Sequence, residues 1–167
     1  NVTEKKIQKY LYNYLKSSYA QEMLEKDMAA TDSEIDSYYN DNKNNYDKVS
    51  YRVLEIAATD ASDSAAVTTA KNSANEMLGK ITDEASFNDL CAEYASNKDE
   101  YKSNKDLSLK TDVTYSTAGQ SVGEWLFDST RTDGNKTVIE DTDNGKFTVV
   151  YFISRTSGKD DSKEDIA

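Results

Sequence analysis

Side chains that could do chemistry are few in this chain, and histidine is absent. Histidine is the usual general base at neutral pH and a common zinc ligand, so its absence disfavours hydrolases and zinc enzymes. The single cysteine, Cys91, has no histidine to activate it, and we predict a buried, unreactive thiol without an internal disulfide. Residues 141–145 are acidic like a calcium loop but lack its spacing and distal glutamate, which favours a hairpin turn. We therefore expect neither a metal nor a cofactor.

The acidic balance of the chain disfavours two kinds of partner. Twenty Lys and Arg residues stand against 31 Asp and Glu residues, which gives a net charge of -11. Nucleic acids and anionic membranes attract clustered cations, so we predict no nucleic-acid partner and no docking on anionic lipid. The charge is uneven, because residues 1–30 carry five lysines and four acids while the excess of acid lies beyond them. Residues 1–30 thus have almost no net charge, whereas the rest of the chain is strongly acidic.

The first element that must be placed is a long helix. Residues 3–29 carry apolar side chains at helical spacing without Gly or Pro, which predicts one continuous helix. Its apolar stripe needs a partner, which is a second copy of this chain, a further helical segment outside this sequence, or the domain that follows. Tyr10, Tyr12, Tyr14 and Tyr19 also offer a face that could bind substrate.

Beyond residue 30, short helices and strands alternate. Thr31 and Glu34 predict a capping box at the start of a second helix, and Asn144 with Gly145 favours a tight hairpin between the last two strands. The other predicted elements are a strand at 49–56, a helix over 62–81, a helix capped by Ser86 with Asp89, an irregular stretch over 97–119 with edge strands at 106–109 and 113–115, a short helix begun by a capping box of Ser121 and Glu124, and strands at 137–140 and 147–154. The last strand is apolar on both faces, as is typical of a central strand.

Three motifs follow one another in the order seen in a known family. Residues 85–96 read Ala-Ser-Phe-Asn-Asp-Leu-Cys-Ala-Glu-Tyr-Ala-Ser, residues 104–107 read Asn-Lys-Asp-Leu, and residues 145–152 read Gly-Lys-Phe-Thr-Val-Val-Tyr-Phe. Over residues 49–155 the chain resembles the parvulin-type (PpiC-like) peptidyl-prolyl cis-trans isomerase domain found in PrsA-like and SurA-like extracytoplasmic foldases. The sequence Thr-Asp-Ser-Glu-Ile at 31–35 is also similar to the PrsA-like linker, which follows a helical chaperone region.

The resemblance implies an α+β fold. The expected architecture is a parvulin-like (FKBP-like) four-stranded antiparallel sheet wrapped by helices, with an N-terminal helical arm. Three regions are implied: an arm and linker at 1–46 from a chaperone-type helical region, a parvulin-like domain at 47–156, and a charged tail at 157–167. The composition of the tail predicts disorder.

The resemblance also implies where the site lies. The two active-site histidines of the family correspond to Arg52, within one residue, and to Thr148, which are the implied catalytic positions. The implied substrate-binding positions are Lys98, Asp99, Leu107, Val122 and Phe127. Taken alone, Arg52 also fits an exposed or salt-bridged residue, and Phe127 also fits the core.

The implied activity is isomerisation of Xaa–Pro bonds, whose barrier is about 18–20 kcal/mol, in unfolded or extended polypeptide clients. Such enzymes bind the twisted amide better than the planar one and need no covalent intermediate. The alternative is a catalytically degraded parvulin fold that serves as a non-enzymatic peptide- or protein-binding module at the cell surface. The expected location is extracytoplasmic, at the surface of a Gram-positive bacterium, held there as a lipoprotein by an anchor outside this sequence.

Overall fold

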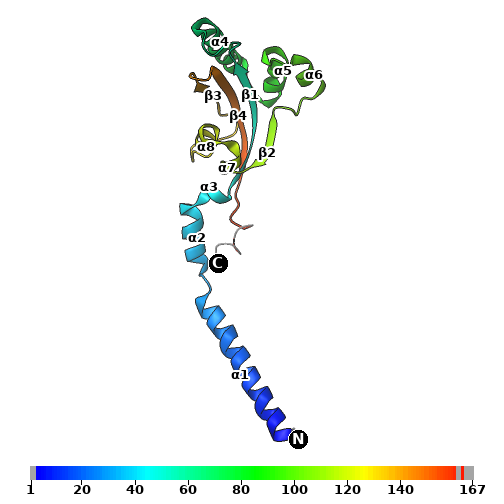
Figure 1. Ribbon diagram of the computed structural model, residues 1–167, viewed down its shortest axis with the longest axis vertical. Coiled ribbons are helices and arrows are strands. Elements are labelled where there is room, and N and C mark those ends of the chain that lie inside the picture. Colours follow the sequence, from blue (N-terminus) through cyan, green and yellow to red (C-terminus); the bar gives the residue numbers. More distant parts are fainter. Residues whose placement is uncertain (1–2, 161–162, 164–167) are drawn as a thin grey trace. The chain divides into compact units, whose positions relative to one another are not determined.

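The structure is a computed structural model that describes residues 3–160 and 163. The chain forms two compact units, which we call the arm unit (described residues up to Asp41) and the sheet unit (Asn42–Asp160). Figure 1 labels the elements along the chain. Each unit is described by itself below.

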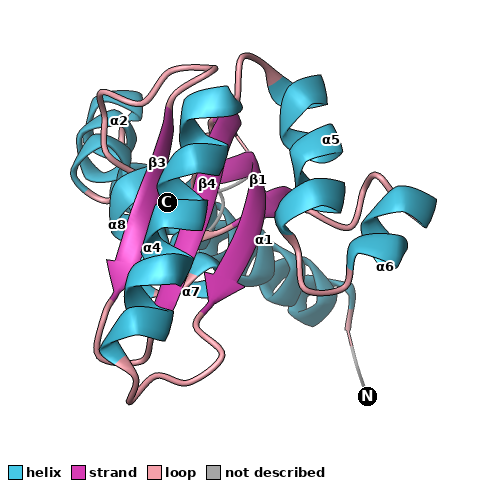
Figure 2. Ribbon diagram, turned by 90° about the horizontal axis from the view of Figure 1, so that it is seen from above, coloured by secondary structure: helices cyan, strands magenta, loops and turns pink. Residues whose placement is uncertain are grey.

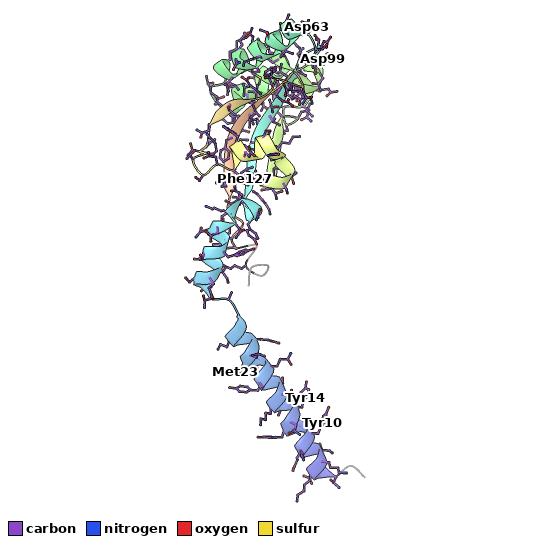
Figure 3. The ribbon with its side chains drawn as sticks, turned by 60° about the vertical axis from the view of Figure 1, so that its left-hand side comes forward. Tyr10, Tyr14, Met23, Asp63, Asp99 and Phe127 are labelled. Carbon is purple, nitrogen blue, oxygen red and sulfur yellow. The ribbon has the colours of Figure 1, made fainter. Side chains whose placement is uncertain are left out.

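The arm unit begins with the predicted long helix. α1 spans Glu4–Met28, so the helix predicted over residues 3–29 is confirmed. Its large apolar side chains are exposed, and Figure 3 shows Tyr10, Tyr14 and Met23 projecting from it. Among the described residues, no helix has both the length and the apolar character needed to cross a membrane.

The second helix of the arm unit, α2 (Asp32–Asp41), starts at the predicted capping box. The Glu34 carboxylate accepts a hydrogen bond from the Thr31 backbone N–H at 2.9 Å, and the Thr31 hydroxyl accepts one from the Glu34 N–H at 3.3 Å. Two backbone donors that a helix start leaves unpaired are thereby satisfied. The sequence prediction of this cap is confirmed.

The sheet unit follows the short helix α3 (Lys43–Tyr46) and is built on four antiparallel strands. The strands are β1 (Lys48–Ala57), β2 (Leu109–Val113), β3 (Lys136–Asp141) and β4 (Lys146–Thr156), and their order across the sheet is β2-β1-β4-β3. β4 is central, as its apolar character on both faces predicted. The predicted α+β fold, a four-stranded antiparallel sheet with helices and a long N-terminal helix, is confirmed.

Each face of the sheet packs against different helices. α4 (Ser64–Lys80) and α5 (Glu84–Tyr94) pack on one face, which we call the α4 face, and α7 (Tyr115–Ala118) and α8 (Gln120–Leu126) pack on the other, the α8 face. Figure 2 shows α4 in front of the sheet and α8 behind it. The alternation of side chains along β4 explains both layers, because Phe147, Val149 and Tyr151 are buried on the α4 face and Val150 and Phe152 on the α8 face.

Several element boundaries differ from the sequence prediction. α5 is capped by Asp83, three residues before the predicted Ser86, which instead lies at the third helical position and completes the capping box. The predicted capping box of Ser121 with Glu124 is wrong, because α8 begins after Gly119, which makes no side-chain cap. Gly119 has φ +79°, a backbone conformation that glycine adopts without strain.

The stretch over 97–119, predicted to be irregular, contains regular structure. α6 spans Lys98–Ser103, and β2 is one edge strand where two short strands were predicted. The predicted hairpin between β3 and β4 is confirmed, but its loop spans the four residues 142–145, and of Asn144 and Gly145 only Gly145 has a positive φ, +63°. The Gly145 N–H donates to the Thr142 carbonyl at 3.1 Å.

The start of the predicted tail is packed on the sheet unit. Gly158 is buried, and its N–H donates to the carboxylate of Asp47 at 3.2 Å. Residues 161–162 and 164–167 of the predicted tail lie outside the described residues.

The thiol of Cys91 is completely buried among the side chains of the α4 face. Burial raises its pKa to about 11, although a hydrogen bond with Ser108 and the charge of Arg52 act in the opposite direction. The thiolate, which is the reactive form, is therefore scarce at neutral pH. We expect Cys91 to resist alkylation in the native protein at pH 8 and to react at once in 6 M guanidinium chloride, with mass spectrometry as the readout.

The same pKa difference predicts how stability depends on pH. An unfolded thiol ionises near pH 9, whereas the folded one keeps its proton to about pH 11. Between these values unfolding releases a proton, so stability is lost as the pH rises, by about 2–3 kcal/mol in total. Urea titrations at pH 8 and 10.5 should show a steeper loss for the unmodified protein than for Cys91→Ala, and equal losses would contradict the assignment.

Candidate functional site

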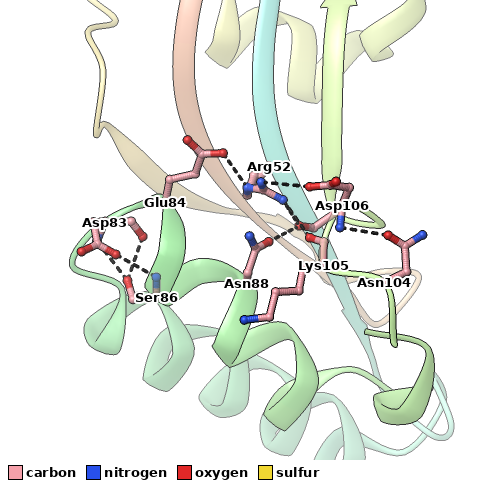
Figure 4. A network of polar contacts seen from close by, with 9 residues as sticks. Arg52, Asp83, Glu84, Ser86, Asn88, Asn104, Lys105 and Asp106 are labelled. Carbon is pink, nitrogen blue, oxygen red and sulfur yellow. Dashed lines mark hydrogen bonds and ion pairs between the residues drawn. The ribbon is translucent and has the colours of Figure 1, made fainter. Parts of the chain in front are cut away.

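Arg52 lies in a buried polar network on the α4 face, drawn in Figure 4. Its Nε donates to the Glu84 carboxylate at 2.9 Å, and its Nη1 donates to the Lys105 carbonyl at 3.0 Å and to the Ser108 hydroxyl at 3.1 Å. A third nitrogen, Nη2, is 3.6 Å from the Asp106 carboxylate. The guanidinium therefore links β1 to α5 and to the loop before β2.

This network suits a structural role for Arg52. The Ser108 hydroxyl passes the chain of hydrogen bonds on to Asn88 of α5 at 3.0 Å. A guanidinium stays protonated in proteins, so it can donate hydrogen bonds and balance charge but does not act as a general base. Only 5% of Arg52 is exposed, and three nitrogens are already engaged.

A second arrangement lies on the α8 face. A hollow of about 310 Å³, which we call the α8 hollow, is lined by Glu55, Ser121, Val122, Ile139, Glu140, Asp141, Lys146 and Thr148. Thr148 of β4 is paired with Glu55 of β1 on one side and with Ile139 of β3 on the other. The three strands and α8 thus contribute to one surface, whose lining includes the apolar side chains of Val122 and Ile139 and the side chain of Thr148.

The rim of the α8 hollow is charged. Lys146 Nζ is 3.2 Å from the Glu55 carboxylate, and Glu140 is 2.7 Å from Lys71 Nζ. Both pairs are half-exposed, so each is expected to contribute little to stability. Among the described residues, no group of three or more acidic or cysteine side chains is placed to hold a metal ion.

The structure brings some predicted site residues together and separates others. Val122 and Thr148 both line the α8 hollow. Arg52 is on the opposite face of the sheet, so the two implied catalytic positions do not meet. Its neighbour Tyr51 is buried on the α8 face, where burial raises the pKa of the phenol. Phe127 is buried under α8, where the edge of its ring contacts Tyr115 at 5.5 Å between ring centroids.

The remaining predicted residues lie elsewhere. Lys98 and Asp99 line an open hollow of about 480 Å³ at the start of α6, together with Ser96 and Lys102. Leu107 is 36% exposed in the loop that Arg52 holds. These side chains and the α8 hollow belong to separate surfaces.

Sequence reasoning missed Glu55, Ile139 and Lys146 as lining residues. Period-two alternation in β3 and β4 puts Ile139 and Thr148 on a definite side of each strand. Their pairing, however, depends on the register across the sheet, which local sequence does not specify. The face of Glu55 could have been predicted from the alternation along β1, which puts it on the same side as Val53 and Tyr51.

The chain was compared with known proteins. A family model described as the PPIC-type PPIASE domain matches residues 30–166. No curated protein matches the chain. One similar solved structure comes from work that describes the virulence factor PEB4 and the periplasmic protein Cj1289 of Campylobacter jejuni as two structurally related SurA-like chaperones. It is 19% identical, covers 98% of this chain and 63% of that one, and has a TM-score of 0.41, so this chain spans less than two thirds of that protein.

Proposed function

Because the chain belongs to the PPIC-type peptidyl-prolyl isomerase domain family, we propose that it binds unfolded or extended polypeptides at the α8 hollow and catalyses rotation about their Xaa–Pro bonds there. The observation that carries this proposal is that Val122 and Thr148, 26 positions apart in the chain, line one hollow together with the apolar side chain of Ile139. Both occupy positions that the family resemblance assigns to its site.

The proposed mechanism is differential binding of the twisted amide. A proline ring would lie against Val122 and Ile139, which removes the amide from water. A twisted amide has lost its conjugation and is less polar than the planar form, so an apolar surface favours it relative to the ground state. In this mechanism the Thr148 hydroxyl would hydrogen-bond the peptide beside the rotating bond. Each tenfold gain in rate requires about 1.4 kcal/mol of such preference.

A second candidate function is peptide binding without catalysis. It is favoured by the engagement of Arg52 on the opposite face, which leaves Thr148 as the implied catalytic position at the α8 hollow. The fold would then act as a holding module for polypeptide clients. The two functions share a binding surface and differ in the rate at which the bound proline isomerises.

The test is exchange NMR on an Ala-Xaa-Pro peptide, with and without an ample amount of the protein. The uncatalysed rate of cis/trans exchange is the reference. We expect faster cis/trans exchange together with shift changes at Val122 and Thr148. Shift changes without faster exchange would leave the binding module as the function. If neither occurs, both candidates are wrong for this surface.

Filling the α8 hollow should abolish the activity. Val122→Arg replaces one of the two apolar lining side chains by a long cationic one beside Ile139, and we expect peptide binding to weaken at least about tenfold, a loss of roughly 1.4 kcal/mol. Thr148→Val keeps the shape and removes the hydroxyl, so it should lower the rate more than the affinity. The matched control is Lys98→Ala with Asp99→Ala, which alters the separate hollow at α6 and should leave exchange unchanged. Loss of activity in the control alone would move the site to α6.

Partners and location are also proposed. The exposed apolar residues of α1 support association of residues 3–29 with a second copy of the chain or with a further helical segment. A concentration-independent monomer in light scattering would exclude self-association. The resemblance of residues 31–35 to the linker of extracytoplasmic foldases supports an extracytoplasmic place at a Gram-positive surface, which protease accessibility on intact cells would test.

A further inference from the structure

α8, the wall of the α8 hollow, is held at the end that lies away from the hollow. Arg155, at the end of β4, donates from Nη2 to the carbonyls of Leu126 and Asp128, both at 3.0 Å. Its guanidinium carbon is 5.7 Å from the centroid of the Phe127 ring. Leu126 is the last residue of α8, so its carbonyl is one that the helix itself leaves unpaired, whereas Asp128 lies just beyond the helix and its carbonyl also accepts from the Arg131 N–H at 3.1 Å.

A second arginine acts on the same end of the helix. Arg131 donates from Nε to the Trp125 carbonyl at 3.0 Å, and its guanidinium carbon is 4.7 Å from the centroid of the Trp125 ring. Two cations therefore bind the carbonyl end of α8, where the helix dipole is negative. Each also lies over an aromatic ring of the segment it binds, which restricts the direction from which it can bind.

Among the described residues, the opposite end of α8 has no side-chain cap and packs against α7 instead. Gly119 precedes it, and Ser121 and Val122 of its first turn line the α8 hollow. Val122 is four residues before Leu126, a separation of about 6 Å along a helix axis. Rotation or sliding of the carbonyl end would therefore be passed directly to the wall of the hollow.

Strand β4 carries both Arg155 and the lining residue Thr148. β4 presents Thr148 to the α8 hollow and ends with Arg155 and Thr156. β4 is paired with both β1 and β3 around Thr148 and still with β1 at Arg155, which pairs with Val49, so Arg155 fixes α8 to the same hydrogen-bonded strand that carries Thr148. Arginine suits this role because its planar group can serve two carbonyls while it stacks on a ring.

We propose that Arg155, with Arg131 as its companion, is a positioning residue that fixes α8 and thereby the place of Val122 in the α8 hollow. The role is indirect, because neither arginine lines the hollow. This inference rests on the proposed function of the hollow for its effect on substrate. Its structural part, the placement of Val122, can be measured without any substrate.

The experiment uses the whole chain with ¹³C-labelled valine methyl groups. We expect Arg155→Gln to shift and broaden the Val122 methyl signals and to raise the KM for a proline peptide on the order of tenfold, with a smaller change in kcat. Arg155→Lys keeps the charge and should restore the signals in part. Arg131→Gln provides a second variant should Arg155→Gln fail to fold. The control is Ile81→Val, a core truncation on the α4 face that should leave the Val122 signals unchanged.

The outcomes separate the two claims. Unchanged Val122 signals and unchanged KM in both glutamine variants would overturn the positioning role. A Val122 shift in the free variants supports that role even when the unmodified chain neither binds nor isomerises the peptide, a result that would end the proposed function alone. Equal shifts in Ile81→Val would show a general loosening of the fold and would also overturn the inference.

Discussion

Replacing Arg52 by methionine is expected to destabilise the sheet unit by about 3 kcal/mol, because hydrogen bonds to a charged group contribute about 1.5–3 kcal/mol and buried partners are left unsatisfied. The Ser108 hydroxyl and the Lys105 carbonyl lose their donor, and Ser108 is completely buried. Methionine retains most of the apolar volume of the stem, so packing loss is small. Urea unfolding followed by circular dichroism would give the change in the free energy of unfolding.

The matched control for this prediction is Glu84→Gln. Glu84 is 42% exposed, so its loss of charge is screened by water and should cost less than about 1 kcal/mol. Equal effects for the two variants would contradict the view that buried partners dominate. Arg52→Lys addresses function separately: it should fold, and it should isomerise peptides as the unmodified chain does. A folded Arg52→Lys protein without activity would instead make Arg52 part of the chemistry.

The second large effect is expected at Gly158. A Cβ added there would lie 2.0 Å from the carbonyl oxygen of Tyr46, and this neighbour is backbone that cannot rotate away. Gly158→Ala must therefore displace the segment after β4, which also breaks the bond to the buried Asp47 carboxylate. We expect a loss of about 2–4 kcal/mol from overpacking and from the lost hydrogen bond to Asp47.

A second glycine provides a control, because its replacement by alanine is expected to raise the stability instead of lowering it. Gly79 lies inside α4, and a Cβ added there meets nothing within 4 Å. Gly79→Ala should therefore stabilise the protein by about 0.5–1 kcal/mol through helix propensity. Thermal unfolding of both variants gives the signs directly. A stabilised or neutral Gly158→Ala protein would mean that the segment is not docked in solution.

Periodicity predicted the elements of the sheet unit because strands and helices bury their faces at different spacings. The two-faced pattern of β4 placed it at the centre, and Thr31 with Glu34 located a helix start to the residue. The start of α5 was missed by three residues because Asp83 and Ser86 form a capping box as favourable as the predicted one. α6 was missed because six mostly polar residues carry no apolar period.

The candidate site was less predictable because it depends on which side of a strand each residue occupies. The family's first-strand histidine corresponds to Arg52 only within one residue, and the adjacent Tyr51 lies on the other face of the sheet. A shift of one residue in β1 therefore moves this predicted catalytic position from one face to the other. Glu55 and Ile139 join Thr148 only through the register of three strands. Long-range pairing of this kind leaves no local mark in the sequence.

Trp125 is the single tryptophan of the chain, and it lies beneath the guanidinium of Arg131 at the carbonyl end of α8. Fluorescence excited selectively at tryptophan therefore comes from this one residue of the sheet unit, whereas the aromatic residues of α1 are all tyrosines. A change in the emission maximum or the fluorescence intensity of Trp125 thus reports on the surroundings of α8 without an added label. Far-ultraviolet ellipticity sums the helices of both units, so a tryptophan transition that does not coincide with the ellipticity transition would show that the α8 region melts separately.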